Sequence, residues 1–178
     1  MRLAAVVAGA WIVGIACGAL ANGGRHPDGL PPRVRVDRLV VYKGEGRMEA
    51  YAGETLLRTY RVAVGSGGEG DKRYEGDLHT PEGTYRIDSR HHSRDYHRFL
   101  HVSYPNREDR RRYRAARRAG EIPEGRGIGG DIGIHGTPTG IPGLALFDWT
   151  AGCIAVTNDE AEELYRAVRD DAVIEINP

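Results

Sequence analysis

Short apolar runs, broken by glycine and proline, are the feature that most constrains the fold of this 178-residue chain. The chain has 25 glycines and nine prolines, residues that mark turns between strands. Runs of strand length recur at 34–43, 47–52, 55–65, 79–88, 99–105, 131–135, 152–156 and 171–177. With only two helical segments, this pattern predicts a mainly β domain with two or so helices. We expect a curled sheet or a sandwich rather than a doubly wound α/β fold.

The first predicted helix spans residues 107–119. It ends before Gly120, a helix-stop residue that Pro123 follows. Seven arginines lie in this segment against two acidic residues. Such a basic helix either contacts an anionic polymer or is a solvated surface helix that docks through Tyr113 and Ala116.

The second predicted helix starts at residues 157–160 (TNDE), which have the form of a capping box. Its apolar residues recur at helical spacing, at Ala161, Leu164, Tyr165 and Val168. By contrast, residues 66–77 are polar and rich in glycine. They predict a loop that does not pack.

Residues 1–21 predict an export signal. An apolar run from Leu3 to Ala16 precedes Ala-Leu-Ala at 19–21, which fits a cleavage site. A spanning helix needs about 20 apolar residues, so the run is short for one. Residues 22–32 are rich in glycine and proline and predict a linker, which leaves 33–178 as the folded domain. We expect a protein exported to the periplasm or cell envelope.

Two alternatives for this segment stay open. If it is not cleaved, it would be a membrane anchor. The residues before Cys17 also weakly resemble a lipoprotein cleavage box, although Gly14 stands where a large aliphatic residue is expected. Contact with a membrane is predicted only if the segment stays on the protein.

The overall charge gives no indication of a nucleic-acid partner. The chain has 25 basic and 25 acidic residues, and the predicted signal contains only one of them, Arg2. Cleavage would leave 24 basic against 25 acidic residues, a net charge of −1. Nothing in this balance indicates nucleic-acid binding. The remaining length is that of one domain with a proper core.

The two cysteines are Cys17 and Cys153. If Cys17 leaves with the signal, Cys153 is a lone thiol in an oxidising compartment and a candidate for thiol chemistry. The alternative is a buried core cysteine. His135 lies eighteen residues before Cys153 in another glycine-flanked apolar run. A cysteine nucleophile needs a neighbouring base, and two short strands of one sheet would bring these side chains together.

Several motifs together resemble the L,D-transpeptidase catalytic domain, the YkuD-type fold of bacterial cell-wall enzymes. They are TPEGTYRI (80–87) with EGD before it, SYPN (103–106), GGDIGIHG (129–136) and DWTAGCIAVTN (148–158). The family signature is a histidine, 14 to 17 residues, Ser or Thr, one residue, and Gly-Cys. Here 14 residues separate His135 from Thr150, Ala151, Gly152 and Cys153.

The resemblance implies an exported cysteine acyltransferase that acts on peptidoglycan stem peptides. Cys153 would attack a diaminopimelate carbonyl at the L centre, and a thioester would form as a terminal D-amino acid leaves. An amine-bearing acceptor, either a second stem peptide or a protein, would then take the acyl group. No cofactor is needed. With water as acceptor, the enzyme would be an L,D-carboxypeptidase or amidase.

Two other classes are weighed against this one. A catalytically silent wall-binding module would need no nucleophile, so the His135–Cys153 pair argues against it. A papain-like peptidase has cysteine before histidine in the chain, and here the order is reversed.

The residues around Cys153 have expected roles. Since Cys153 lies five residues before Asn158, no helix dipole acts on it, so His135 must lower the pKa of its thiol. Backbone N–H groups around Gly152 and Cys153 would stabilise the oxyanion. Gly152 would let the substrate carbonyl approach, and Gly136 would free space beside the imidazole.

Other residues near the thiol have more than one interpretation. Thr150 would hydrogen-bond the loop or the substrate, or serve as a turn residue. Asp148 and Trp149 form a pocket wall or a packed pair. Many family members have His or Arg where Ala151 stands, and Arg or Asn where Ala155 stands. The two alanines therefore leave the acceptor, and the choice between transfer and hydrolysis, open.

The remaining histidines do not predict a metal site. They are His26, His79, His91, His92, His97 and His101. No HExxH-type pair is present, and the arginines nearby would oppose a cation. His79 either lines the cleft or lies on the surface.

Overall fold

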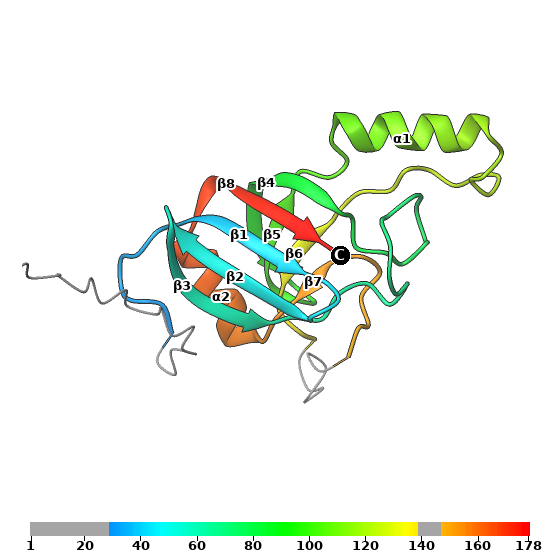
Figure 1. The fold of residues 1–178 in the computed structure, drawn as a ribbon. Helices are drawn as coiled ribbons and strands as arrows, with labels where there is room; N and C mark the ends of the chain where they lie inside the picture. Colours follow the sequence, from blue (N-terminus) through cyan, green and yellow to red (C-terminus); the bar gives the residue numbers. More distant parts are fainter. Residues whose placement is uncertain (1–28, 139–146) are drawn as a thin grey trace, which may run out of the picture.

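The computed structural model describes residues 29–138 and 147–178. In these ranges the chain forms eight strands and two helices (Figure 1). In chain order they are β1 (Val36–Tyr42), β2 (Arg47–Ala52), β3 (Thr55–Arg61), β4 (Gly83–Ser93), β5 (His97–Val102), α1 (Arg107–Arg118), β6 (Gly133–His135), β7 (Ile154–Ala155), α2 (Asn158–Ala167) and β8 (Val168–Asn177). The predicted mainly β fold is confirmed. The predicted export signal and most of the linker lie outside the described residues.

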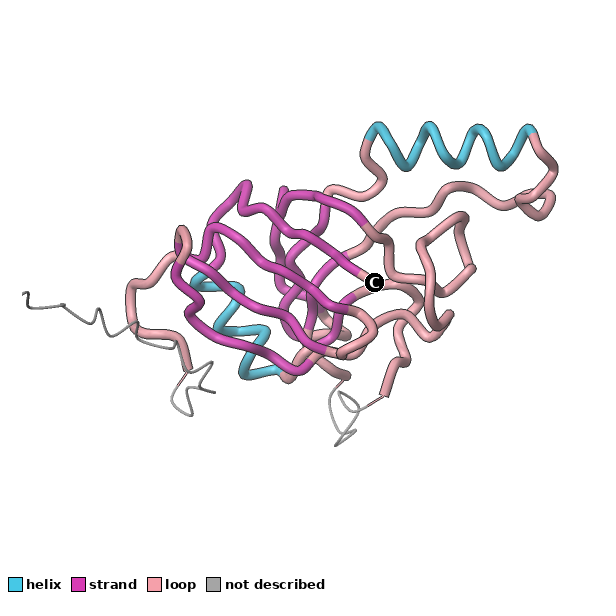
Figure 2. Tube along the Cα trace, in the orientation of Figure 1, coloured by secondary structure: helices cyan, strands magenta, loops and turns pink. Residues whose placement is uncertain are grey.

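One curled sheet contains all eight strands, in the order β3-β2-β1-β8-β4-β5-β6-β7. The β1–β8 and β6–β7 pairs are parallel and the other neighbours are antiparallel. The chain after β3 returns to the far edge, where Ala63 bridges Ala155 and Gly65 bridges Thr150. These bridges bring the two edges of the sheet together, so the sheet curls on itself (Figure 2).

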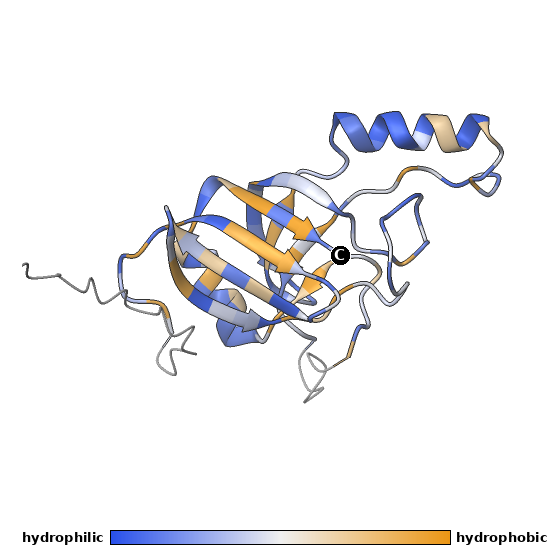
Figure 3. Cartoon of the chain, in the orientation of Figure 1, coloured by the Kyte–Doolittle hydropathy of each residue, from blue (hydrophilic) through white to orange (hydrophobic). Residues whose placement is uncertain are grey.

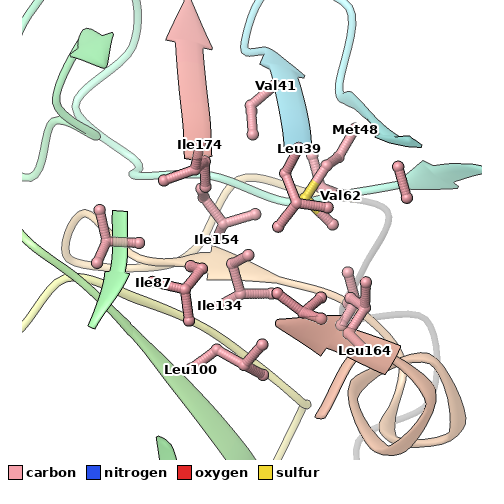
Figure 4. Packing of buried hydrophobic residues seen from close by; sticks show 14 of the residues in the cluster. Leu39, Val41, Met48, Val62, Ile87, Leu100, Ile134, Ile154, Leu164 and Ile174 are labelled. Atoms are coloured by element: carbon pink, nitrogen blue, oxygen red, sulfur yellow. The ribbon is translucent and has the colours of Figure 1, made fainter. Parts of the chain in front are cut away.

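The core fills the inside of this curl. Apolar side chains from several strands meet there with Leu164 of α2 (Figure 4), and the apolar and polar residues of the strands interleave along the chain (Figure 3). The fully buried side chains include Leu39, Met48, Ile87, Leu100, Ile134, Ile154, Leu164 and Ile174. Each such burial stabilises the fold by about 1.5–3 kcal/mol.

Helix α2 covers β5 and β6 and closes the core on that side. Its N-cap Thr157 and Glu160 form the predicted capping box. Ala161 and Leu164 are buried as expected. The prediction for Val168 is wrong in one respect: the residue is buried, but as the first residue of β8 rather than on the helix.

The loop predicted at residues 66–77 is confirmed and extends to residue 82, directly before β4 begins. The expectation that it does not pack is wrong. The chain has only two lysines, and both are buried against this loop. Lys43 forms an ion pair with Glu82 at 2.7 Å and donates to the Gly70 carbonyl at 2.6 Å. Lys72 forms a second ion pair with Asp77 at 2.8 Å. Buried charges need such partners, so the two lysines hold this polar segment in place.

Helix α1 stands away from the sheet (Figures 1 and 2). Asn106 caps its N-terminus in a capping box with Asp109, the helix's only buried residue. The Asp109 carboxylate accepts a hydrogen bond from Tyr85 of β4 at 3.2 Å, and Arg112 bridges Asp109 and Asp71. Polar contacts therefore fix α1 to the body. Within the described ranges, no helix has the length and apolar character to cross a membrane.

Candidate active site

Strands β6 and β7 place His135 and Cys153 on one face of the sheet. In the parallel register, Ile134 lies opposite Ile154 and His135 opposite Ala155. Both isoleucines are fully buried in the core. Because side chains alternate along a strand, His135 points to the other face, and so does Cys153, which directly precedes Ile154. The two side chains are thus diagonal neighbours across the strand pair.

The backbone fixes the orientation of the His135 ring. Its Nδ1 lies 2.6 Å from the carbonyl oxygen of Gly136. A carbonyl only accepts, so Nδ1 carries the proton and Nε2 holds the free lone pair. His135 is 3% exposed, and this burial lowers its pKa, although the hydrogen bond to Gly136 opposes part of the effect. The imidazole is therefore neutral and ready to accept a proton at Nε2.

Three aromatic rings enclose His135. The Tyr96 ring lies 4.5 Å from the imidazole, and the Phe99 ring is stacked on it at 5.9 Å. The Trp149 ring meets it edge-on at 5.8 Å. The sequence flagged Trp149 as a wall of the pocket but missed Tyr96 and Phe99. The antiparallel pairing of Phe99 with His135 brings the second of these rings into place.

Cys153 is partly buried, and its thiol is protonated in this setting. The Sγ donates to the backbone carbonyl of Asp131 at 3.4 Å. Burial raises the pKa of Cys153 and the Asp131 charge adds to this, while a hydrogen bond with the Gly133 backbone and the charge of Lys72 oppose it. The sequence predicted that His135 would lower this pKa. That prediction is wrong for the free protein, because the imidazole is neutral and burial dominates.

The loop from Thr150 to Cys153 is held by its own hydrogen bonds. The buried Thr150 hydroxyl donates to the Cys153 carbonyl at 2.6 Å and accepts the Gly152 N–H at 3.2 Å. Of the roles expected for Thr150, the one seen in the structure is a hydrogen bond from its hydroxyl to the loop. The Gly152 N–H, expected to bind an oxyanion, is already engaged. Gly152 has φ +133, and a Cβ there would lie 2.8 Å from the His79 carbonyl.

Asn158 occupies the space beside Gly136 that was expected to be free for the imidazole. A Cβ on Gly136 would lie 2.1 Å from Asn158 Oδ1, the atom that accepts the Thr137 N–H at 2.9 Å. Asn158 therefore supports the turn after His135, and Gly136 does not open space beside the imidazole. Ala151 is exposed beside the thiol. Ala155 is fully buried, so it offers no surface to an acceptor.

Two more residues flagged in the sequence have structural contacts. Asp148 accepts the Val64 N–H at 2.9 Å, so it ties the loop before Cys153 to the segment after β3. His79 is partly exposed, and its ring lies 3.1 Å from the Glu69 carbonyl. Among the described residues, no group of three or more His, Cys, Asp or Glu side chains is arranged to hold a metal ion.

The sequence profile of YkuD, the L,D-transpeptidase catalytic domain, matches residues 36–176. The chain belongs to this family. YafK of Escherichia coli strain K12 is 28% identical over 135 residues, which are 72% of this chain and 45% of that protein. The chain therefore spans about half the length of the curated relatives that it matches.

Solved structures have the same fold. The helical cell shape determining protein Pgp2 from Campylobacter jejuni has a TM-score of 0.59 and 26% identity, over 81% of this chain and 48% of that one. L,D-transpeptidase 3 from Mycobacterium tuberculosis, in complex with a faropenem-derived adduct, has a TM-score of 0.54. It is 13% identical over 79% of this chain and 60% of its own. This second likeness concerns the fold alone.

Proposed function

We propose that this protein is an exported L,D-transpeptidase that acts on peptidoglycan stem peptides through a Cys153 thioester. The observation that supports the proposal is that β6, which carries the neutral His135, pairs with β7, which directly follows the partly buried Cys153. Family membership supports the reaction class, and the name of Pgp2 links a relative to cell shape.

The first half of the reaction forms the thioester. The Sγ of Cys153 attacks the carbonyl carbon of the diaminopimelate residue, and its proton passes to Nε2 of His135. The carbon–nitrogen bond to the terminal D-amino acid then breaks, and that amine leaves with the proton from His135. Because both groups are neutral at rest, His135 acts as a general base during the attack rather than through a preformed thiolate.

The second half returns the enzyme to its starting state. An acceptor amine attacks the thioester carbonyl and loses a proton to His135, which then protonates the departing sulfur of Cys153. Since the Gly152 N–H is engaged by Thr150, the N–H of Cys153 is our candidate donor to the oxyanion. These steps use the thiol, the imidazole and the backbone, so we propose no cofactor.

Mass spectrometry of the products tests this function. Purified protein is incubated with a disaccharide-tetrapeptide, which should yield a cross-linked dimer and free D-amino acid. Cys153→Ala should lose activity by several orders of magnitude, and a carbapenem should add its mass to the wild type only. His135→Gln should keep the fold and lose most activity. Substantial turnover by Cys153→Ala would refute the proposal.

Hydrolysis is the second candidate. Ala151 is exposed beside the thiol and brings no polar group to hold an acceptor amine. Water would then compete for the thioester and release a tripeptide. The ratio of dimer to tripeptide, with excess acceptor present, decides between the two. A dominant dimer would rule out a hydrolytic bias.

Export is the remaining part of the proposal. Its support is the apolar run and the Ala-Leu-Ala sequence within residues 1–21. N-terminal sequencing of the protein from the cell envelope should begin at Asn22. A chain that begins at Met1, or a lipid on Cys17, would indicate a membrane tether instead.

A further inference from the structure

Helix α1 carries six of its seven arginines on one side. At 3.6 residues per turn, they lie within about 120° of its circumference. They are Arg107, Arg110, Arg111, Arg114, Arg117 and Arg118, and we call this set the arginine face. All six are exposed, and Figure 3 shows α1 hydrophilic along most of its length.

Most of this charge is not neutralised within the described residues. Arg111 pairs with Glu108 at 2.8 Å, and Arg117 donates to the Tyr113 hydroxyl at 3.0 Å. The other four arginines form no ion pair with the part of the chain that the structure describes. Like charges three or four residues apart on a helix repel each other. Arg117 and Arg118 lie in the last turn, where positive charge favours the helix, but helix stability does not account for the other four. The whole set suits binding to an anionic partner.

The opposite side of α1 lines a groove. Arg112, Tyr113 and Ala116 form one wall of this cavity of about 540 Å³, and residues 71–73 form the other. The arginine face lies on the other side of α1 from this groove and is open to solvent.

We propose that the arginine face binds the carboxylates of the peptidoglycan polymer and holds the enzyme on it. This inference rests on the proposed function for the identity of the polymer. In stem peptides with diaminopimelate, carboxylates outnumber amines, so the polymer is a polyanion that complements six guanidinium groups. A membrane is a poorer match. Helices that lie on bilayers bury an apolar face, whereas the arginine face has none and Tyr113 and Ala116 turn to the groove.

Co-sedimentation with insoluble peptidoglycan sacculi, stripped of lipid and protein, tests this surface with the full chain. The face variant replaces the four arginines that form neither an ion pair nor a side-chain hydrogen bond within the described residues: R107Q, R110Q, R114Q and R118Q. Glutamine keeps the helix propensity of arginine, and circular dichroism checks the helix. The matched control makes the same change of charge at four exposed arginines elsewhere: R33Q, R61Q, R94Q and R169Q.

The face variant should bind sacculi about ten-fold more weakly than the wild type at low salt, because screened charge attraction supplies the binding. Binding of the wild type should fall as salt rises, and the control should match the wild type. All three proteins should turn over a soluble disaccharide-tetrapeptide equally, since the arginine face points away from the groove. On intact sacculi, only the face variant should be slower.

Equal sacculus binding by the face variant and the wild type would overturn the inference. The inference would also be overturned if the face variant lost binding to phosphatidylglycerol vesicles but still bound sacculi like the wild type. That result would assign the arginine face to a membrane. If none of the proteins acts on the soluble substrate but sacculus binding still depends on the arginine face, the proposed function fails and this inference stands.

Discussion

Gly133→Ala tests whether the rings around His135 are needed for its chemistry. A Cβ at this position would lie 2.3 Å and 2.4 Å from two atoms of the Phe99 ring, and 2.8 Å from the Leu100 carbonyl. Ordinary carbon contacts are about 3.5–4.0 Å, so the ring must move by about 1 Å. Phe99 is the ring stacked on His135, and its movement would disturb the base.

The expected cost follows from this overlap. Overpacking a well-filled site destabilises a protein by about 1–3 kcal/mol. For a domain of this size, a loss of about 2 kcal/mol lowers Tm by about 4–8 °C. Activity should fall by about 100-fold, because a misplacement of about 1 Å at a catalytic group has that effect. Thermal unfolding and dimer formation from tetrapeptide measure the two quantities.

A matched control and a double variant isolate the cause. Gly130→Ala lies in the same segment, and its Cβ would meet nothing within 4 Å, so it should behave as the wild type. Removing the ring in Gly133→Ala/Phe99→Ala should cost less than the sum of the single changes. The contact with the Leu100 carbonyl keeps this rescue partial. Full activity and unchanged Tm in Gly133→Ala, or strictly additive costs, would refute the reasoning.

Three further predictions concern the buried charges and the thiol. Lys43→Met should destabilise the fold by about 3 kcal/mol in urea unfolding, because it leaves the Glu82 carboxylate without its partner. The double variant Lys43→Met/Glu82→Gln should recover part of this loss. Burial alone would raise the pKa of Asp77, but Lys72 and three backbone N–H groups hold that pKa below its usual value. The stability that Asp77 provides should therefore be present above about pH 4 and lost as pH falls further, so Asp77→Asn and the wild type should converge in acid. Alkylation of Cys153 by iodoacetamide should rise with pH through an apparent pKa above that of a free cysteine, because burial raises the pKa of this thiol. A rate already at its plateau below neutral pH would show a preformed thiolate.

Much of the fold follows from sequence patterns because the signals are local. Period-two and continuous apolar runs predict the strands, and the capping box at residues 157–160 marks the start of α2. The strand expected at 152–156 is shorter because Gly152 adopts φ +133 and turns the chain before β7. The strand expected at 79–88 starts later and extends to Ser93, since pairing with β5 determines its length.

The surroundings of the candidate site could not be predicted in the same way. Phe99 reaches His135 only through the register of β5 on β6, and a sequence does not state a register. The burial of Lys43 and Lys72 depends on partners many residues away or in the same loop. The direction of the Cys153 pKa depends on how deeply the thiol is buried, which the spacing of motifs does not reveal.

The proposed export would place Cys153 in an oxidising compartment. Oxidation of a cysteine follows its thiolate character and its exposure. Cys153 is partly buried, donates to the Asp131 carbonyl and has a raised pKa, so its thiol should resist oxidation there. In the proposed mechanism, the proton moves to His135 only when a substrate carbonyl draws the sulfur away from Asp131. In that mechanism, burial lowers the pKa of the proposed base, His135, and raises the pKa of the proposed nucleophile, Cys153, so both are neutral before the substrate arrives.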